Sequence, residues 1–230
     1  MTPLSLPVKI AYIKNMDIIY DDNKKNKAIR VIDQLAQLYP QAGTRLAYGS
    51  IFELLVAVVL SAQSTDEQVN RVTADLFGVA NTPEKMAWLG LNELEKLIRG
   101  VGIYRNKARH LKNLAAMLVE CYDGRVPDSF EELLTLPGVG RKSANVVMAV
   151  GFHQPGLGVD THVQRVAYRT GLVSGKRNDA SEMELKKQIP PDKWGDAHHL
   201  LIYHGRNTCQ ARKPDCVNCI LINECAQRMD

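Results

Sequence analysis

The stretch Leu136-Pro137-Gly138-Val139-Gly140-Arg141-Lys142 joins a short helical pattern to a longer apolar one through a tight turn. Its two glycines permit positive φ and let the backbone approach a ligand closely. The amides of such a turn, followed at once by a helix N-terminus, form an anion site that suits a DNA phosphate. An ordinary helix–helix connection also commonly contains glycine, so the turn alone leaves both interpretations open.

Lys142 lies in the first turn of the helix that follows, beside Arg141. The positive end of the helix dipole disfavours a cation there. This position therefore favours the neutral amine, which is the nucleophilic form of lysine. The alternative is a solvated surface lysine, which is the usual fate of this residue type.

Asp160 precedes a second amphipathic helix, within the stretch Gly158-Val159-Asp160-Thr161-His162-Val163. The simple interpretation is an N-cap that stabilises the helix by ~1 kcal/mol. The stronger hypothesis is an ionised carboxylate, held by helix-end amides, that shares a cleft with Lys142 and stabilises a developing cation. His162 would line the same cleft in an orienting role.

Four of the five cysteines gather near the C-terminus, in the pattern C-x6-C-x2-C-x5-C: Cys209, Cys216, Cys219 and Cys225. Four thiolates suit zinc or an iron–sulfur cluster. Clustered cysteines indicate thiols kept reduced for a metal in the cytosol, in preference to a disulfide framework. The remaining cysteine, Cys121, falls on an apolar helical pattern and is expected to be buried.

Helical periodicity dominates the chain and no long stretch alternates with period two, so the predicted fold class is all-α. Helices are expected at about 24–38, 51–62, 66–79, 92–100, 104–122, 141–151, 161–170, 181–188 and 193–204, with short ones capped by Thr82 and Ser129. Trp88 and Trp194 are expected in the core. His198, His199 and His204 complete no ligand set and are assigned to the core or a helix surface.

The net charge of +4 permits an anionic partner without proving one. No apolar run approaches the ~20 residues of a membrane helix, and the N-terminus lacks the pattern of a secretory signal. Residues 1–21 are expected to be a disordered extension, with Met16 as an alternative start.

Four elements occur together and in order: the stretch Leu60-Ser61-Ala62-Gln63-Ser64-Thr65-Asp66, the 136–142 turn, the 159–162 stretch and the cysteine loop. This combination resembles the endonuclease III family, which are bifunctional DNA glycosylase/AP lyases of the helix–hairpin–helix superfamily. The resemblance spans about residues 22–230. It implies two helical domains flanking a DNA-binding cleft, with a six-helix barrel at 44–154 and a cluster domain that combines 22–43 with 155–230.

The resemblance also implies roles for individual residues. Lys142 corresponds to the Schiff-base nucleophile and Asp160 to the assisting carboxylate, while the four clustered cysteines hold a [4Fe–4S] cluster. Gln63 corresponds to the residue that fills the gap left by a flipped nucleotide. Ile103 stands where the family usually has a leucine that wedges the opposite strand.

Other DNA contacts are expected from Tyr104 at the same turn, from the hairpin turn and from the cysteine loop. The predicted set is Gln63, Ile103, Tyr104, Gly138, Val139, Gly140, Arg141, His162, Arg212 and Lys213. Gln63 could instead cap a helix, and the turn at Ile103 could be a buried anchor. The basic residues of the 104–122 helix, including Lys107 and Lys112, are expected to be a solvated face.

The expected function is excision of oxidised or ring-saturated pyrimidines from duplex DNA, followed by a β-elimination nick, by a monomer in the bacterial cytoplasm. The partner is damaged double-stranded DNA. Three alternatives are an adenine-mismatch glycosylase, a non-catalytic helix–hairpin–helix DNA-binding protein and a zinc-stapled DNA module. The first normally lacks the nucleophilic lysine, and the second has no use for the pair Lys142 and Asp160.

Overall fold

The computed structural model describes residues 22–226, and every regular element within that range is a helix. The prediction of an all-α fold is therefore confirmed, whereas the predicted extension at 1–21 lies outside the described residues. The elements are α1 (Asp22–Leu38), α2 (Ile51–Leu60), α3 (Asp66–Val79), α4 (Pro83–Trp88), α5 (Leu91–Leu97), α6 (Tyr104–Tyr122), α7 (Phe130–Thr135), α8 (Arg141–Gly151), α9 (Thr161–Thr170), α10 (Asn178–Gln188), the short 3-10 helix η1 (Pro191–Lys193) and α11 (Trp194–Asn207).

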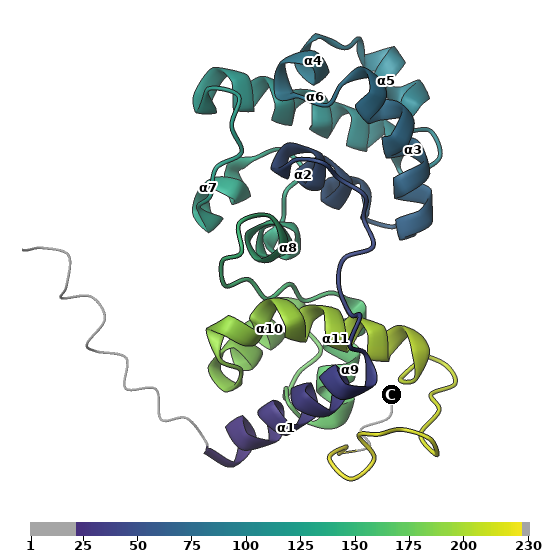
Figure 1. The fold of residues 1–230 in the computed structure, drawn as a ribbon, viewed down its shortest axis with the longest axis vertical. Helices are drawn as coiled ribbons and strands as arrows, with labels where there is room; N and C mark the ends of the chain where they lie inside the picture. The colour runs from purple at the N-terminus through teal and green to yellow at the C-terminus, as the bar shows by residue number, and fades with distance from the viewer. Residues whose placement is uncertain (1–21, 227–230) are drawn as a thin grey trace, which may run out of the picture.

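Two separate hydrophobic cores organise these helices. The first draws its buried residues from α2 to α8, and the second draws them from α1, α9, α10 and α11. Figure 1 shows the two groups as an upper and a lower half of the molecule. Because α1 belongs to the lower half, the chain leaves that half after α1 and returns to it before α9.

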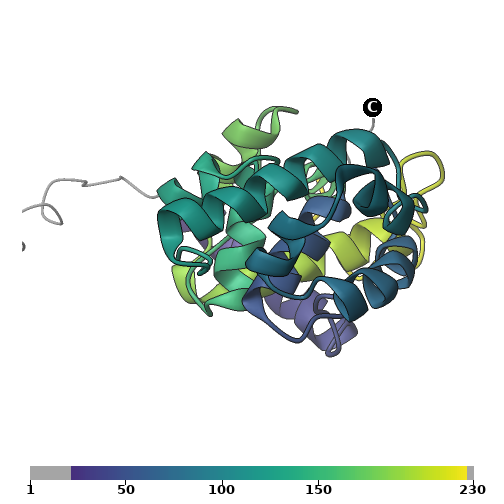
Figure 2. The ribbon, with the colours of Figure 1, turned by 90° about the horizontal axis from the view of Figure 1, so that it is seen from above.

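The helix α2 forms the centre of the first core, with residues 54–60 all buried. It packs against α3, α6 and α8, so it needs no polar face. Its β-branched valines suit a strand by propensity, but burial on every side within a run of ten residues makes it a helix. Figure 2 shows the long helix α6 (teal) spanning this half from above, and α4 packs along it.

Local capping explains where several helices begin. Ser50 accepts from the Glu53 amide at the start of α2, and Thr65 forms a reciprocal capping box with Gln68 at the start of α3. Ser129 accepts from the Glu132 amide and so caps α7 as predicted, while its hydroxyl donates to Glu131.

Several helix boundaries differ from the sequence prediction. The helix α5 begins at Leu91 after Gly90, one residue before the predicted start, and ends at Leu97. The helix α10 starts three residues early, at Asn178, and α11 continues to Asn207. The added residues, 178–180 and 205–207, are not part of the second core, so both helices continue past the residues that they bury there.

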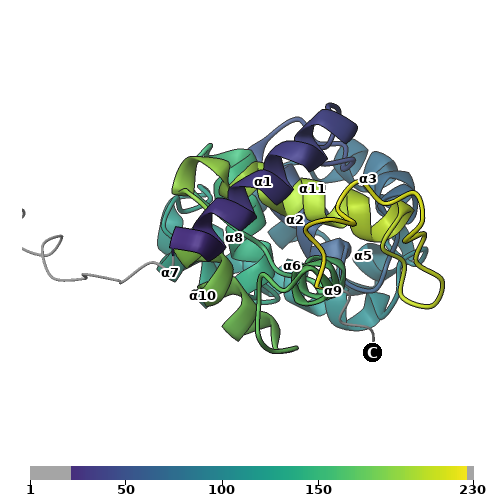
Figure 3. The ribbon, with the colours of Figure 1, turned by 90° about the horizontal axis from the view of Figure 1, so that it is seen from below.

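The second core carries the C-terminal loop on its side. Figure 3 shows α1 lying across α10 and α11, with the yellow C-terminal loop beside α9 and α11. Arg169 of α9 is buried and donates to the carbonyls of Gln210 and Ala211. A buried guanidinium therefore holds the backbone of the loop against the helix.

Two burial predictions were wrong. Trp88 is 90% exposed at the end of α4, and the thiol of Cys121 is also exposed. Trp194 packs against the second core and donates its indole N–H to the Ile189 carbonyl. Within residues 22–226, every helix is too short or too polar to cross a membrane.

Candidate active site

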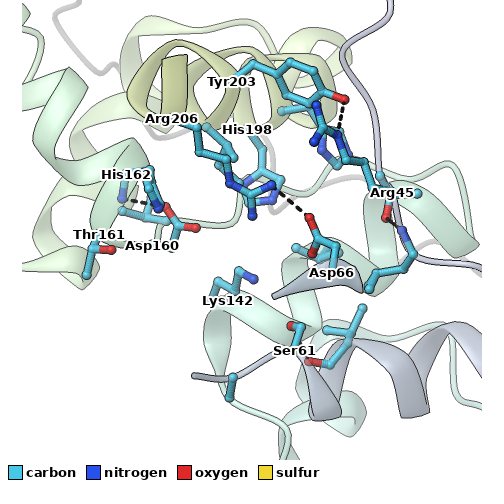
Figure 4. A pocket seen from close by; sticks show the side chains of 18 of the residues that line it. Arg45, Ser61, Asp66, Lys142, Asp160, Thr161, His162, His198, Tyr203 and Arg206 are labelled. Atoms are coloured by element: carbon cyan, nitrogen blue, oxygen red, sulfur yellow. Dashed lines mark hydrogen bonds and ion pairs between the residues drawn. The ribbon is translucent and has the colours of Figure 1, made fainter. Parts of the chain in front are cut away.

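A pocket of about 540 Å³ lies between the two cores. The first core contributes residues 61–64 and Lys142 to its wall, and the second contributes residues 160–162 and one face of α11. Figure 4 shows the Lys142 side chain entering the pocket, with Asp160 and His198 on the facing wall. The structure therefore brings together the two residues that sequence analysis singled out for catalysis.

The hairpin turn sets the position of Lys142. The Val139 amide donates to the Leu136 carbonyl at 3.1 Å, and Gly138 has a φ of 82°. A side chain at Gly138 would also lie 2.9 Å from Cβ of His110, so the turn requires glycine for two reasons. Gly140 caps α8 and faces open space, which places Lys142 in the first turn of that helix.

Asp160 is the N-cap of α9, as predicted. Its Oδ1 accepts from the amides of His162 at 2.8 Å and Val163 at 2.9 Å. Burial alone would raise the pKa of Asp160, but the amide hydrogen bonds and the nearby charge of Lys142 lower it below its usual value. The carboxylate is therefore ionised at neutral pH and lies in the electrostatic field of Lys142.

His198 is a pocket residue that sequence analysis assigned only to a core or a surface. Its Nδ1 lies 2.6 Å from the Gly158 carbonyl oxygen, which can only accept, so Nδ1 carries the proton and Nε2 is free of one. Burial lowers the pKa of His198 to about 3, and the ring is neutral. Gly158 allows this contact, because a side chain there would meet the ring at 3.1 Å.

His162 lines the pocket beside Asp160, as predicted. Its Nδ1 lies 3.1 Å from Nη2 of Arg165, which also donates to the Gly205 carbonyl. Burial lowers the pKa of His162, so this ring too is neutral at pH 7. The guanidinium of Arg165 therefore fixes the orientation of the His162 ring.

The structure also brings Gln63 and Ile103 close together. Gln63 follows α2 and Ile103 is the N-cap of α6, and both are in the left-handed region, with φ of 53° and 48°. A side chain at Gly102 would lie 2.6 Å from the Gln63 carbonyl oxygen. The Ile103 side chain is 53% exposed, and Tyr104 is half-buried against the first core.

The basic residues of the predicted DNA surface have different environments. Arg212 and Lys213 are exposed in the loop between Cys209 and Cys216. Arg141 is half-exposed, but its guanidinium is paired with Glu182. Lys107, expected on a solvated face, is buried and bonded to residues 60–64, so that prediction was wrong.

The four clustered cysteines lie near one another. Burial raises the pKa of the Cys219 thiol, and the nearby thiols of Cys225, Cys209 and Cys216 raise it further. Nη1 of Arg169 lies 3.7 Å from Sγ of Cys209, where its charge would stabilise a thiolate. Within residues 22–226, no group of three or more His, Cys, Asp or Glu side chains is arranged closely enough to hold a metal ion.

One face of α11 supplies pocket residues that sequence reasoning missed: His198, His199, Ile202, Tyr203 and Arg206. They recur at helical spacing, which is the one signal the sequence offered. Arg206 donates to Asp66 at 2.8 Å and Arg45 donates to Tyr203 at 3.1 Å, so two contacts join the cores across the pocket (Figure 4).

Comparison with known proteins identifies the family. The model of the HhH-GPD superfamily base excision DNA repair proteins matches residues 56–191. Endonuclease III of Haemophilus influenzae is 45% identical over 201 residues, which cover 87% of this chain and 95% of that protein. The chain belongs to the endonuclease III family. Endonuclease III of Escherichia coli is 44% identical over 201 residues, with the same coverage of 87% and 95%.

The fold also agrees with a solved structure of the endonuclease III family. A trapped endonuclease III–DNA covalent intermediate matches with a TM-score of 0.85 and 45% identity, covering 88% of this chain and 96% of that one. The predicted family and fold are confirmed. The chain is a DNA glycosylase and AP lyase of base excision repair.

Proposed function

We propose that this DNA glycosylase and AP lyase acts on oxidised or ring-saturated pyrimidines in duplex DNA and nicks the strand by β-elimination. The observation that carries the proposal is the arrangement of Lys142 and Asp160 on facing walls of one pocket between the two cores. The pocket is concave, is lined by both polar and apolar side chains, and is large enough for a nucleotide turned out of the duplex.

The chemistry follows from the placement of an amine and a carboxylate in one pocket. The Lys142 amine attacks C1′ of the extruded sugar, and the bond from C1′ to the base breaks as the new C–N bond forms. The ionised Asp160 stabilises the positive charge that develops on the sugar. The aminal formed in this way loses a proton from nitrogen, and its C1′–O4′ bond breaks, which opens the sugar ring and gives the Schiff base. The Schiff base then loses a C2′ proton and the C3′–O bond breaks, which releases the 3′ phosphate and nicks the strand 3′ to the lesion.

Extrusion of the base requires residues that enter the duplex. Gln63 would fill the gap and Ile103 would wedge the opposite strand, with Tyr104 beside it. The segments that carry Gln63 and Ile103 lie close together, which supports this assignment, since both residues would enter the duplex at one place. His162 would orient the substrate within the pocket.

Phosphates would contact the hairpin turn and the cysteine loop. The hairpin turn at Gly138, Val139 and Gly140 leads directly into the N-terminus of α8, where a helix favours an anion. Arg212 and Lys213 would contact the backbone farther along the duplex. Arg141 would contribute through its exposed edge, because its inner face is paired with Glu182.

The chemistry of the four cysteines fits a [4Fe–4S] cluster. Cys209, Cys216, Cys219 and Cys225 would hold the irons as thiolates, with Arg169 beside the first of them. The cluster would supply a rigid anchor for the loop and no step in base removal.

The proposed domains are a helical barrel at 44–154 and a cluster domain that joins 22–43 to 155–230. The first core spans residues 52–148 and the second combines residues 28–35 with 157–221, which supports this division. We further propose that the enzyme acts as a monomer in the bacterial cytoplasm on damaged double-stranded DNA.

Borohydride trapping on a duplex containing thymine glycol tests this function. The enzyme should form a covalent complex with the lesion strand and none with an undamaged duplex of the same sequence. Lys142→Gln should abolish the complex while keeping most of the DNA affinity, because the amine is the nucleophile. Base release without any trapped complex would instead indicate a monofunctional glycosylase, and a trapped complex in the variant would indicate another nucleophile.

A further inference from the structure

Lys107 of α6 is a buried cation whose hydrogen bonds all go to uncharged acceptors. Its residue is only 2% exposed, and Nζ donates to the carbonyls of Leu60 at 2.8 Å and Ala62 at 2.5 Å and to Oγ of Ser64 at 3.0 Å. An ammonium group has three donors, so these contacts use its full capacity. Burial lowers the pKa of Lys107 to about 8, which reflects the cost of placing a charge there.

These contacts connect two separate segments, which we name the 61–64 loop and the 101–103 turn. Oγ of Ser64 accepts from Lys107 and also from the Gly102 amide at 3.0 Å. Lys107 itself follows the 101–103 turn by one helical turn, and its backbone amide donates to the Ile103 carbonyl at 3.2 Å. One side chain therefore ties the loop that carries Gln63 to the turn that carries Ile103.

Both segments carry a residue in an unfavourable backbone conformation. Gln63 and Ile103 have positive φ, and for a β-branched residue such as Ile103 this is a clear outlier. Such conformations persist only where the surrounding contacts hold them, and they concentrate at functional sites. The Lys107 hydrogen bonds are contacts of this kind, since they fix the carbonyl before Gln63 and the hydroxyl after it.

We propose that Lys107 is a positioning residue that holds Gln63 and Ile103 as one rigid unit for entry into the DNA duplex. This inference rests on the proposed function, in which these two residues fill and wedge the duplex. Lys107 is buried beneath both segments and acts through them, without contacting the substrate. Its role is to set the geometry before binding, so that extrusion of the base requires no ordering of either segment.

Lys112 offers a matched control on the same helix. Its Nζ donates to the carbonyls of Ala87 and Leu89, each at 2.8 Å, and so anchors the segment after α4. Like Lys107, it donates to backbone carbonyls that end a preceding helix, but it is half-buried and contacts neither the 61–64 loop nor the 101–103 turn. Lys107→Met and Lys112→Met therefore remove equivalent groups from two different places.

The experiment compares two substrates under single-turnover conditions. One is a thymine-glycol duplex, where a base must be extruded, and the other is a single-stranded oligonucleotide with an abasic site, where none must be. Lys107→Met should slow excision from the duplex by about tenfold, equivalent to about 1.4 kcal/mol, relative to Lys112→Met. Borohydride trapping on the single strand should match that of the Lys112→Met enzyme.

A spectroscopic readout separates positioning from general damage. A 2-aminopurine beside the lesion fluoresces when it is unstacked, and Lys107→Met should reduce the amplitude of that signal while Lys112→Met retains it. Equal losses on duplex and single strand, with an unchanged fluorescence amplitude, would overturn the inference. Failure of the wild-type enzyme to trap either substrate would instead count against the proposed function.

A second variant tests the same unit with Lys107 intact. Gly102→Ala places a methyl group against the Gln63 carbonyl and should force the two segments apart, with the same selective loss on duplex. The double change Lys107→Met/Ile103→Ala should be no slower on duplex than the slower single variant, because both act on one unit. Additive losses in that double-mutant cycle would show that Lys107 does not act on the unit that contains Ile103. If Lys107→Met does not fold, the loss measured for Gly102→Ala on duplex against single strand tests the inference instead.

Discussion

Arg141 of α8 binds Glu182 of α10 through two hydrogen bonds, Nη2 to Oε1 at 2.7 Å and Nε to Oε2 at 3.1 Å. The Glu182 side chain is 3% exposed and also accepts from Lys186 at 2.8 Å. Burial alone would raise the pKa of Glu182, but these hydrogen bonds lower it, so the carboxylate is ionised. The pair fixes the helix that carries Lys142 to the core that carries Asp160.

Arg141→Met should therefore destabilise the protein more than it weakens DNA binding. We expect a loss of about 2 kcal/mol in the free energy of unfolding. This is less than the loss expected when a buried charge keeps no partner, because Lys186 still pairs with Glu182. Denaturant unfolding measures the loss, and a salt titration of DNA affinity should show a slope smaller by ~0.9, because one phosphate contact at the exposed edge of Arg141 is removed. An unchanged slope would remove Arg141 from the DNA interface and leave it only the ion pair with Glu182.

Asp160→Asn should keep the α9 cap and lose catalysis. Asparagine caps helices as well as aspartate, so its side-chain oxygen should still accept from the His162 and Val163 amides. Without the charge, base release should fall by about 100-fold or more, as when other electrostatic stabilisers are removed. Thermal unfolding tests whether the cap is kept, and single-turnover excision tests whether catalysis is lost. Near-normal turnover would mean that Asp160 is only a structural cap.

Cys216→Ser should impair cluster retention and DNA binding more than Lys142→Gln does. The purified wild-type protein should be yellow-brown and contain about four irons per chain, as a four-thiolate cluster requires. Iron and sulfide analysis, with visible absorption, measures retention in each variant. Stoichiometric zinc without iron or sulfide in anaerobically purified protein would contradict the assignment.

Arg212→Ala/Lys213→Ala should weaken binding to lesion and undamaged DNA alike. Each phosphate contact removed should lower the slope of log affinity against log salt by ~0.9. Trapping at saturating DNA should persist, because Lys142 is on the other side of the pocket from this loop. An unchanged slope and affinity would remove these two exposed residues from the DNA interface.

His198→Asn should make the protein less sensitive to acid. The pKa of His198 is lowered by burial to about 3 from its usual 6.5, so only the unfolded state takes up the proton between these values. Folded wild-type protein should thus lose about 1.4 kcal/mol per pH unit through this window because of His198. Asparagine can still donate to the Gly158 carbonyl, so the variant should fold. Its free energy of unfolding should fall less steeply than that of the wild type as the pH is lowered.

Circular dichroism during acid titration measures that slope. The charged groups that act on His198 are Lys142 and His199, which disfavour its protonation, and Asp160, which favours it. His110→Asn, at an exposed histidine, is the control and should reproduce the wild-type slope. Parallel slopes for His198→Asn and wild type would show that another buried group controls acid unfolding.

Local signals predicted many of the helices well. The caps at Ser50, Thr65, Thr82 and Asp160 each depend on a hydrogen bond to an amide two or three residues ahead. Such contacts lie within one turn of the chain, so a short window contains both partners. The turn before Lys142 was recognisable for the same reason.

Burial was much harder to predict from the same windows. Trp88 and Cys121 look like core residues by type but face solvent, whereas Lys107 looks like a surface residue and is buried. The side chain of Lys107 finds its acceptors 43 to 47 residues earlier in the chain. No local pattern contains both ends of such a contact.

The sequence by itself determined the all-helical class, the family and the pairing of Lys142 with Asp160 as candidates, because each rests on short motifs with distinctive spacing. Only the tertiary structure decided which side chains complete the pocket. His198 reaches Gly158 from 40 residues away, and Arg206 reaches Asp66 from 140 residues away. The first contact forms within the second core and the second joins the two cores, so both depend on the summed packing of segments that are distant in sequence.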